Sequence, residues 1–463
     1  MAGLSLAGCK KGEKVPNLPP ETHMAVNSIN LSGENRLNSL VTLQWWGTDP
    51  DGIVVSYEIS LDQSNWTLTT RQDSTFLFSI QSGSDTVDID LWVRAVDNNG
   101  EKDPTPAYLK VPVKNTPPVA TFDRALVPAD TSHTLITLAW QVSDPDGDGT
   151  ITSIELKAND GPWVELPTSE SAVVVFPTEP TKQGTVQSKI IYVDGSSGPD
   201  IHGVELNAWN TFYLRARDVA GSESMTDTIH SVYVTSQVSD MLVIGAHPSS
   251  PKAFYTSHLK QAGVDFDFID YALADGKNQP RIWNPTFELL LSRYNRVLIY
   301  ANEMEFTSAS NQQDILLEFA AQGLQAYANA GGKICVSSSF PNDFNPNSIL
   351  FGILPIKALS SPAGKSRLPT DSLLVGSHGY PNLVSSAFIA GLDPFYPSED
   401  GQVVYTAQLT NSDGPVDSKV VGVRRVSGSE TAMVFFSVEL HRVNKDPDAI
   451  NALFDKIFNQ ELK

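Results

Sequence analysis

Residues 41–51 have the sequence VTLQWWGTDPD, and residues 136–146 repeat it as ITLAWQVSDPD. In the first copy, Val41, Leu43 and Trp45 alternate with polar residues, and an Asp-Pro-Asp turn follows. Alternation with a period of two indicates a β-strand with one buried face. A second pair of stretches, WVRAVD at 92–97 and YLRARD at 213–218, follows in the same order. The repeat is too long for a solenoid unit and predicts two β-sandwich modules.

The two modules resemble fibronectin type III and related immunoglobulin-like domains. Those families place a core Trp on an early strand, here Trp45 and Trp140, and carry an aromatic-x-Arg strand that ends in a Gly turn. The resemblance implies sandwiches over residues 25–113 and 118–236, the second with an insertion at about 172–204. A short, proline-stiffened linker, KNTPP at 114–118, joins them. Such modules are expected to act as spacers or binding platforms.

Composition narrows the range of partners. The 463 residues carry a formal net charge of −21, which repels phosphate backbones and argues against a nucleic-acid partner. Only two cysteines are present, Cys9 and Cys335, which excludes a disulfide framework and a zinc site built from cysteines. No apolar run is long enough to predict a membrane-spanning helix.

The chain begins MAGLSLAGCKKGEK, and Leu6-Ala7-Gly8-Cys9 resembles the lipobox of bacterial lipoproteins. The resemblance implies that Cys9 carries a diacylglycerol and anchors the protein to a membrane of the bacterial cell envelope, with residues 1–24 as signal remnant and linker. A lipid attached to one cysteine would supply the membrane contact that the acidic surface does not. The other interpretation is a chance LAGC at an unstructured terminus.

Residues 144–155, DPDGDGTITSIE, satisfy the calcium-loop pattern D-x-[DN]-x-[DN]-G-x5-E. The pattern predicts Ca²⁺ as a cofactor that rigidifies the second sandwich, and its ligands would be Asp144, Asp146, Asp148, the Thr150 carbonyl and Glu155. The flanking segments have strand character, which argues against a helix-loop-helix EF-hand. The alternative is that Asp-Pro-Asp-Gly serves only as a turn.

From about residue 240 the pattern changes to alternating strands and helices. Buried strands are predicted at 241–245, 266–271, 296–300, 333–337 and 431–438, and helices at 254–262, 311–330 and 448–462. Alternation of this kind predicts an α/β domain over 240–463 with a doubly wound, largely parallel sheet.

The stretch AYANAGGKICVSSSF at 326–340 resembles the class I glutamine amidotransferase-like fold, where a helix and a Gly turn lead into the nucleophile strand. Ser339 stands at the nucleophile position, but the family's Cys is absent and Pro341 follows within the turn. Glu439 and His441 follow the late strand TAMVFFSV, in reverse of the family's order. A serine hydrolase or amidase using Ser339 and His441, with Glu439 orienting the His, is therefore an alternative and not the first hypothesis.

Open α/β sheets bind ligands beyond the carboxyl ends of their strands. Four residues are predicted at that edge as a ligand pocket: His247, Asn302, Glu303 and Ser338. Cys335 lies within a predicted strand and is expected to be a buried apolar residue.

Three functions follow from these observations. The first is a non-catalytic, lipid-anchored envelope protein for binding or assembly, in which the sandwiches present the α/β domain to a protein or glycan partner. The second is the serine hydrolase. The third is a calcium-dependent adhesion module.

Overall fold

The computed structural model describes residues 16–463 except 27–30, 34–35, 38, 79, 81–83, 129, 250, 273–279, 342–343, 361–365 and 412–415. The chain divides into two compact units. The first comprises Met1–Ala120, Val142–Ile154 and Arg215–Thr226, and the second Thr121–Gln141, Glu155–Leu214 and Asp227–Lys463. The lipobox residues, including Cys9, lie outside the described residues.

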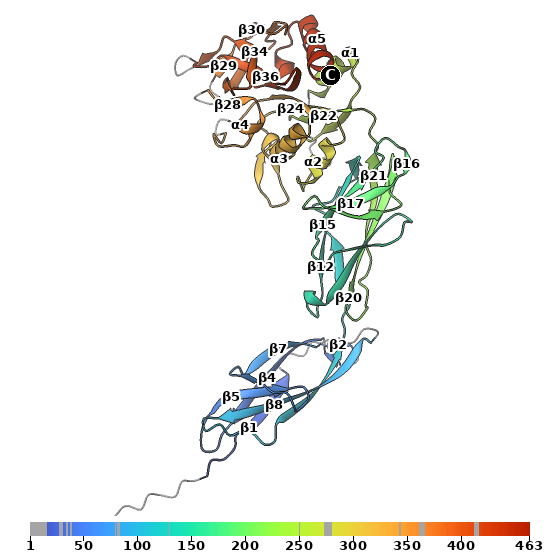
Figure 1. Cartoon of the computed structure of the whole chain (residues 1–463), viewed down its shortest axis with the longest axis vertical. Coiled ribbons are helices and arrows are strands. Elements are labelled where there is room, and N and C mark those ends of the chain that lie inside the picture. The colour runs from blue at the N-terminus through green and yellow to red at the C-terminus, as the bar shows by residue number, and fades with distance from the viewer. Residues whose placement is uncertain are drawn as a thin grey trace, which may run out of the picture. The chain divides into compact units, whose positions relative to one another are not determined.

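The first module is a sandwich of two sheets (Figure 1). One has the order β1 (Glu21–Val26), β4 (Leu40–Thr48), β7 (Asp73–Leu77). The other has the order β2 (Leu31–Gly33), β3 (Arg36–Leu37), β9 (Ala107–Lys114), β8 (Thr86–Asp97), β5 (Val54–Ser60), β6 (Thr67–Thr69). Val41, Leu43 and Trp45 face the core between the sheets, as the alternation predicts. Strand β1 begins four residues before the predicted boundary at residue 25, because its backbone pairs with β4 from Glu21 opposite Thr48 to Val26 opposite Leu43.

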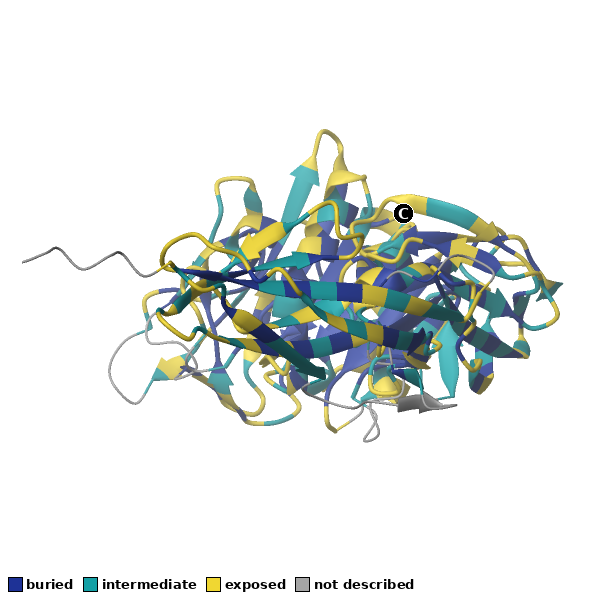
Figure 2. Cartoon of the chain, turned by 90° about the horizontal axis from the view of Figure 1, so that it is seen from below, coloured by how far each residue is buried: buried dark blue, intermediate teal, exposed yellow. Residues whose placement is uncertain are grey.

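The second module has two five-stranded sheets. The first has the order β10 (Val119–Phe122), β12 (Ile136–Ser143), β15 (Ala172–Pro177), β17 (Ser188–Tyr192), β18 (Ser197–Ile201). The second has the order β11 (Thr131–His133), β21 (Asp227–Thr235), β20 (Ala208–Asp218), β13 (Ile151–Ala158), β14 (Val164–Leu166), and β16 (Gly184–Thr185) pairs with β19 (Glu205–Leu206). Trp140 is 2 % exposed, so both repeated Trp residues belong to cores. Along the strands, buried and exposed residues alternate, as Figure 2 shows.

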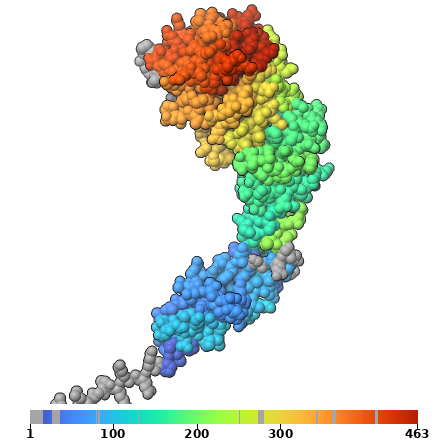
Figure 3. Space-filling model, in the orientation of Figure 1, coloured from blue at the N-terminus to red at the C-terminus, as the bar shows by residue number. Residues whose placement is uncertain are grey.

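The C-terminal domain, yellow to red in Figure 3, is built on a nine-stranded sheet. Its order is β23 (Asp267–Asp270), β22 (Met241–Ala246), β24 (Arg296–Ala301), β27 (Lys333–Ser338), β37 (Glu430–Phe436), β36 (Val420–Ser427), β34 (Gly401–Ala407), β30 (Leu373–Gly376), β31 (Leu383–Val384). The first five strands are parallel. The remaining pairings are antiparallel.

The sheet is therefore mixed, and the prediction of a largely parallel sheet is wrong for its second half. The reason lies in the connections. Strands β36 and β37 are joined by a turn at Gly428, whose φ is 63°, and a connection this short can only join antiparallel neighbours.

Helices cover both faces of the sheet (Figure 1). On strand β22, Leu242 and Ile244 pack on one face with α2 (Thr286–Leu291), α3 (Leu316–Asn329) and α4 (Leu350–Ile353). Met241 and Val243 pack on the other face with α1 (Lys252–Gln261) and α5 (Pro447–Asp455), after which Lys456–Glu461 forms a π-helical turn. Both faces of β22 are thus buried, which explains its unbroken apolar sequence. No helix among the described residues is long and apolar enough to cross a membrane.

Short sheets complete the domain: β25 (Glu305–Thr307) with β26 (Gln313–Ile315), β28 (Ile356–Leu359) with β33 (Phe395–Pro397), and β29 (Ser366–Leu368) between β32 (Ile389–Leu392) and β35 (Thr410–Asn411). Strand β26 of the β25–β26 hairpin contains Gln313–Ile315, which were predicted to belong to the start of the long helix. Helix α3 begins at Leu316 instead of 311 for this reason.

Candidate functional site

Four strand ends meet at one edge of the sheet and surround a cavity of about 590 Å³. His247 follows β22, Asn302 and Glu303 follow β24, and Ser339 follows β27. Glu439 and His441 follow β37, with His441 in a 3₁₀ turn over Leu440–Arg442. Parallel strands place their carboxyl ends on the same edge, which brings residues about 190 positions apart in sequence into one site.

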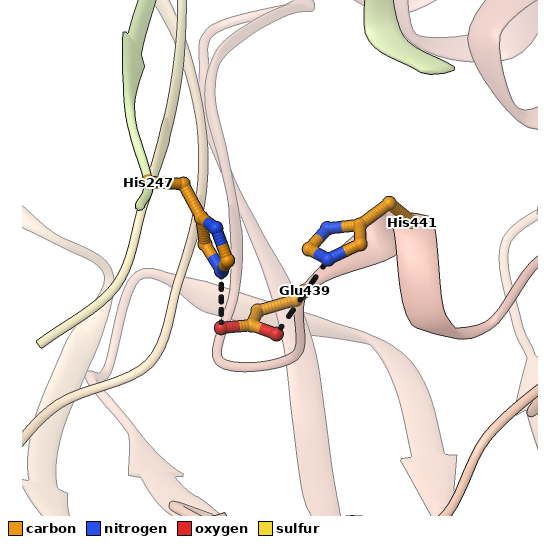
Figure 4. Close-up of side chains that lie close together, drawn as sticks. All are labelled: His247, Glu439 and His441. Carbon is orange, nitrogen blue, oxygen red and sulfur yellow. Dashed lines mark hydrogen bonds and ion pairs between the residues drawn. The ribbon is translucent and has the colours of Figure 1, made fainter. Parts of the chain in front are cut away.

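The Glu439 carboxylate lies between two imidazoles (Figure 4). His247 Nε2 is 3.2 Å from Glu439 Oε1, and His441 Nε2 is 3.9 Å from Glu439 Oε2. The two rings meet edge to face with centroids 5.0 Å apart. All three side chains are largely buried, with 10 %, 10 % and 17 % of their surface exposed for His247, Glu439 and His441.

The charge states follow from these surroundings. Burial opposes ionisation of Glu439, but the hydrogen bond from His247 and the nearby His441 and Arg442 outweigh it and lower the pKa of the carboxyl. Burial lowers the pKa of His441 to about 4, so its ring is neutral at pH 7. Arg442 Nη1 lies 3.3 Å from Glu439 Oε2, and this ion pair balances the carboxylate charge.

A buried hydroxyl fixes the loop that carries Glu439. Ser337 Oγ donates to the Val438 carbonyl at 3.1 Å and accepts from the Leu440 N–H at 3.1 Å. Tyr255 on α1 lies 3.2 Å from the same hydroxyl. Ser337 therefore clamps the residues on both sides of Glu439, a role that its place in a strand does not reveal.

Ser339 lacks the surroundings of a nucleophile. Its hydroxyl points to Glu439 Oε1 at 3.5 Å, and no hydrogen bond joins it to an imidazole among the described residues. In a nucleophile elbow, the N–H of the next residue stabilises the oxyanion. Here the Phe340 N–H donates to the buried Asp393 Oδ2 at 3.3 Å, and the Phe340 ring is buried against Phe435.

The predicted pocket residues divide into two groups. His247, Asn302 and Glu303 line the cavity. Ser338 is fully buried, and its hydroxyl donates to the carbonyl of Ser339. Cys335 is also fully buried, and burial raises the pKa of its thiol. The sequence did not indicate the contributions of Ser249, Asp393 and Arg442, although Arg442 is adjacent to His441 in sequence.

The predicted calcium loop is held by backbone hydrogen bonds. Asp146 is fully buried and accepts the N–H groups of Ser39 at 2.9 Å and Thr116 at 2.6 Å. Asp148 Oδ1 accepts the Asp144 N–H, and the Thr150 carbonyl accepts the Val219 N–H. Glu155 lies on strand β13. Calcium binding by this loop remains a prediction, and Asp144 Oδ2 is buried there without a hydrogen-bond partner among the described residues.

The same contacts reveal a longer repeat. Asn17-Leu18-Pro19-Pro20 precedes the first module as Asn115-Thr116-Pro117-Pro118 precedes the second. The N–H before each Pro-Pro pair donates to the Asp-Pro-Asp turn, Leu18 to Asp51 and Thr116 to Asp146. Each Asn side chain donates to the Asp that ends the Arg-containing strand, Asn17 to Asp97 and Asn115 to Asp218. The duplicated acidic residues thus secure the entry of the chain into each sandwich.

Comparisons with known proteins give no family. No family model and no curated protein matches the chain. Solved structures similar to parts of it include the PKD1 domain of Vibrio anguillarum Epp, at 15 % identity over 21 % of this chain and 99 % of that one, with a TM-score of 0.16. The Clostridium thermocellum CbhA fibronectin(III)-like modules match at 12 % identity over 46 % and 94 %, with a TM-score of 0.16.

A third similar structure is a putative GMP synthase protein from Thermoplasma acidophilum. It matches at 8 % identity over 48 % of this chain and 97 % of that one, with a TM-score of 0.26. All three TM-scores are below 0.5, so the functional conclusions below depend on the residues of this chain.

Proposed function

We propose that the protein is a non-catalytic, lipid-anchored protein of the bacterial envelope that acts in binding or assembly. Its sandwiches carry the α/β domain, whose pocket at His247, Glu439 and His441 receives a group of a protein or glycan partner. The observation that carries this proposal is the hydrogen bond from the Phe340 N–H to Asp393. It occupies the donor that acyl-transfer chemistry at Ser339 would need.

The pocket has the features of a recognition site. Its lining combines Arg442, Glu303 and Asn302 with Ala390 and Gly391, and its volume accommodates a side chain or a small ligand group. Converging polar groups in a concave site fix the orientation of a bound group. These features support binding without requiring a covalent step.

A fluorophosphonate probe tests the absence of serine chemistry. We expect the native protein to label no more than the Ser339→Ala variant. Labelling of the native protein that disappears in Ser339→Ala would contradict the proposal and favour the hydrolase. Retained folding of the variant is checked from its melting curve.

A photo-crosslinking amino acid tests the pocket as the partner site. Placed at Glu303, an exposed residue that lines the cavity, it is expected to give a defined adduct in intact cells. His230, which is exposed on strand β21 of the second sandwich, is the matched control position and is expected to give none. Equal adducts at both positions would argue against the pocket.

The anchor is tested separately through Cys9. We expect metabolic labelling with a fatty acid to mark the native protein and not Cys9→Ser, and the variant to leave the membrane fraction. A labelled Cys9→Ser variant would remove the lipid from the proposal without affecting the pocket.

A further inference from the structure

We propose that His247, Glu439 and His441 form a binding site for one divalent transition-metal ion such as Zn²⁺. One ligand atom from each residue lies within 4.8 Å of the others. Tetrahedral ligands at about 2.0–2.1 Å from zinc stand about 3.3–3.5 Å apart. The 3.2 Å and 3.9 Å separations from Glu439 to the two imidazoles already approach this spacing, so small side-chain rotations would close the site.

The second observation is the state of His441. Its Nδ1 is buried without a hydrogen-bond partner in the described part of the chain, and its Nε2 is beyond hydrogen-bond distance from Glu439. A buried polar atom without a partner lowers stability, and such atoms are rare in native proteins. A metal ion at the centre of the cluster would bind Nε2, the nitrogen 3.9 Å from Glu439 Oε2, and would hold in place a ring that no hydrogen bond at Nδ1 fixes among the described residues.

Ser249 contacts the ring nitrogen of His247 that faces away from Glu439. His247 Nδ1 accepts the Ser249 backbone N–H at 3.1 Å and lies 2.8 Å from Ser249 Oγ. Without metal, the ring proton lies on Nε2 and is directed to Glu439. Metal at Nε2 requires the proton on Nδ1, where Ser249 Oγ can accept it in place of the hydrogen bond from the Ser249 backbone N–H, so the ring changes tautomer without a net loss of a proton.

Arg442 competes with the metal. Its Nη1 pairs with Glu439 Oε2, and its Nη2 donates to the Phe388 carbonyl at 2.7 Å. The side chain is therefore held beside the carboxylate and disfavours a second cation there. Replacing Arg442 should strengthen metal binding, an effect that a purely structural role of the cluster would not produce.

The site would keep open coordination positions. Three protein ligands leave room for at least one more, and the cavity beside them is lined by Asn302, Glu303 and Ser339. The inference goes beyond the proposed function, because metal binding can be measured without knowledge of the partner or the lipid anchor.

The test is titration of Zn²⁺ into the metal-stripped, untagged full chain by isothermal calorimetry, with Co²⁺ absorption to report the ligand set. We expect one ion per chain, at least tenfold weaker binding in His441→Ala and Glu439→Gln, and unchanged binding in His230→Ala, which removes an exposed His elsewhere. Arg442→Gln is expected to bind more tightly than the native chain. Because Glu439→Gln preserves shape, it guards against a folding defect in His441→Ala.

Two results would overturn the inference: no stoichiometric binding by the native chain, or binding that none of the cluster variants weakens. Either of these results could occur while the fluorophosphonate labelling and the crosslinking at Glu303 still support the binding function. The metal site and the proposed function can therefore fail independently.

Discussion

Asp51 and Asp146 occupy the same place in the duplicated sequence but have different burial. Asp146 is fully buried and accepts two backbone N–H groups, whereas Asp51 is exposed and accepts the Leu18 N–H at 3.2 Å. An exposed N–H that loses its acceptor can bond to water instead, whereas a buried N–H that loses its acceptor is left without a partner. The same residue type at the same turn should therefore differ in its contribution to stability.

We expect Asp146→Ala to lower the free energy of unfolding by about 2–6 kcal/mol, because two donors at about 1–3 kcal/mol each lose their acceptor. The matched Asp51→Ala change should cost less than about 1 kcal/mol. Scanning calorimetry of the full chain measures both variants. Equal effects would show that burial of the turn does not govern its contribution.

Calcium has a narrower possible role than the sequence pattern suggests, because both Asp146 oxygens have backbone donors. Asp144 Oδ2 has no partner among the described residues, and burial raises the pKa of this carboxyl. Asp144 Oδ2 is therefore the buried oxygen of the loop that an ion would reach without displacing a hydrogen bond. We expect millimolar Ca²⁺ to raise the melting temperature of the native chain and not of Asp144→Asn. An unchanged native melting temperature would leave the loop as a turn.

At the scale of elements, the approach of helices α2 and α3 depends on Gly323. A Cβ at this position would lie 2.9 Å from Phe287 Cδ1 and 3.3 Å from the Glu288 backbone N. Phe287 is fully buried, so its ring has little room to move. The glycine is retained in the helix although Ala would be the better helix former.

Gly323→Ala is expected to destabilise the protein by about 1–3 kcal/mol, since overpacking outweighs the helix-propensity gain of about 1 kcal/mol. Gly352→Ala in α4 is the control, because no atom lies within 4 Å of its added Cβ. It should be neutral or slightly stabilising. Thermal unfolding of both variants measures these effects. A Gly323→Ala variant more stable than the native chain would show that α2 and α3 can move apart with little loss of packing energy.

Some strands of the large sheet were predictable from the sequence, and others were not. Strands β22, β24 and β27 were predictable because both of their faces are buried and their sequences are continuously apolar. The antiparallel half was missed because strands such as β34, GQVVYTA, mix exposed and buried residues without a clear period. The edge of the sheet that holds the cavity could be predicted from where the parallel strands end. The hydrogen bond from Phe340 to Asp393 could not be predicted, since it joins residues 53 positions apart in sequence.

At the scale of the whole molecule, the second compact unit contains a core shared by the second sandwich and the α/β domain. Leu135, Val174 and Ile191 of the sandwich belong to the same apolar cluster as Phe287 and Leu290 of the α/β domain. The sequence predicted separate domains because its repeats and period changes mark where folds begin, not which surfaces pack together. The two parts should therefore influence each other's stability.

A buried histidine lies within this junction and makes it sensitive to pH. His133 Nδ1 is 2.6 Å from Thr235 Oγ1, and His133 Nε2 is 2.6 Å from the Tyr294 hydroxyl, which donates to Asp267 at 3.1 Å. A neutral imidazole satisfies this chain of hydrogen bonds. Burial lowers the pKa of His133 below its ordinary value of 6.5, against a smaller opposing effect of Asp267.

Because the folded His133 resists protonation, the unfolded chain binds more protons below about pH 6.5. Its contribution to stability is therefore complete above pH 6.5 and is lost as the pH falls toward the pKa of the folded state, by up to about 1.4 kcal/mol per pH unit. We expect His133→Gln to flatten the pH dependence of the unfolding free energy between about pH 6.5 and 5, and the exposed His230→Gln to leave it unchanged. Burial also lowers the pKa of His441, which gives the unfolding free energy a pH dependence of the same sign. Because His441 is present in the native chain and in both variants, the comparison isolates the contribution of His133. If the unfolding free energies of the native chain and of His133→Gln changed with pH in parallel, protonation of His133 would not destabilise the folded state. The shared core would then be less tightly packed around His133 than the structure implies.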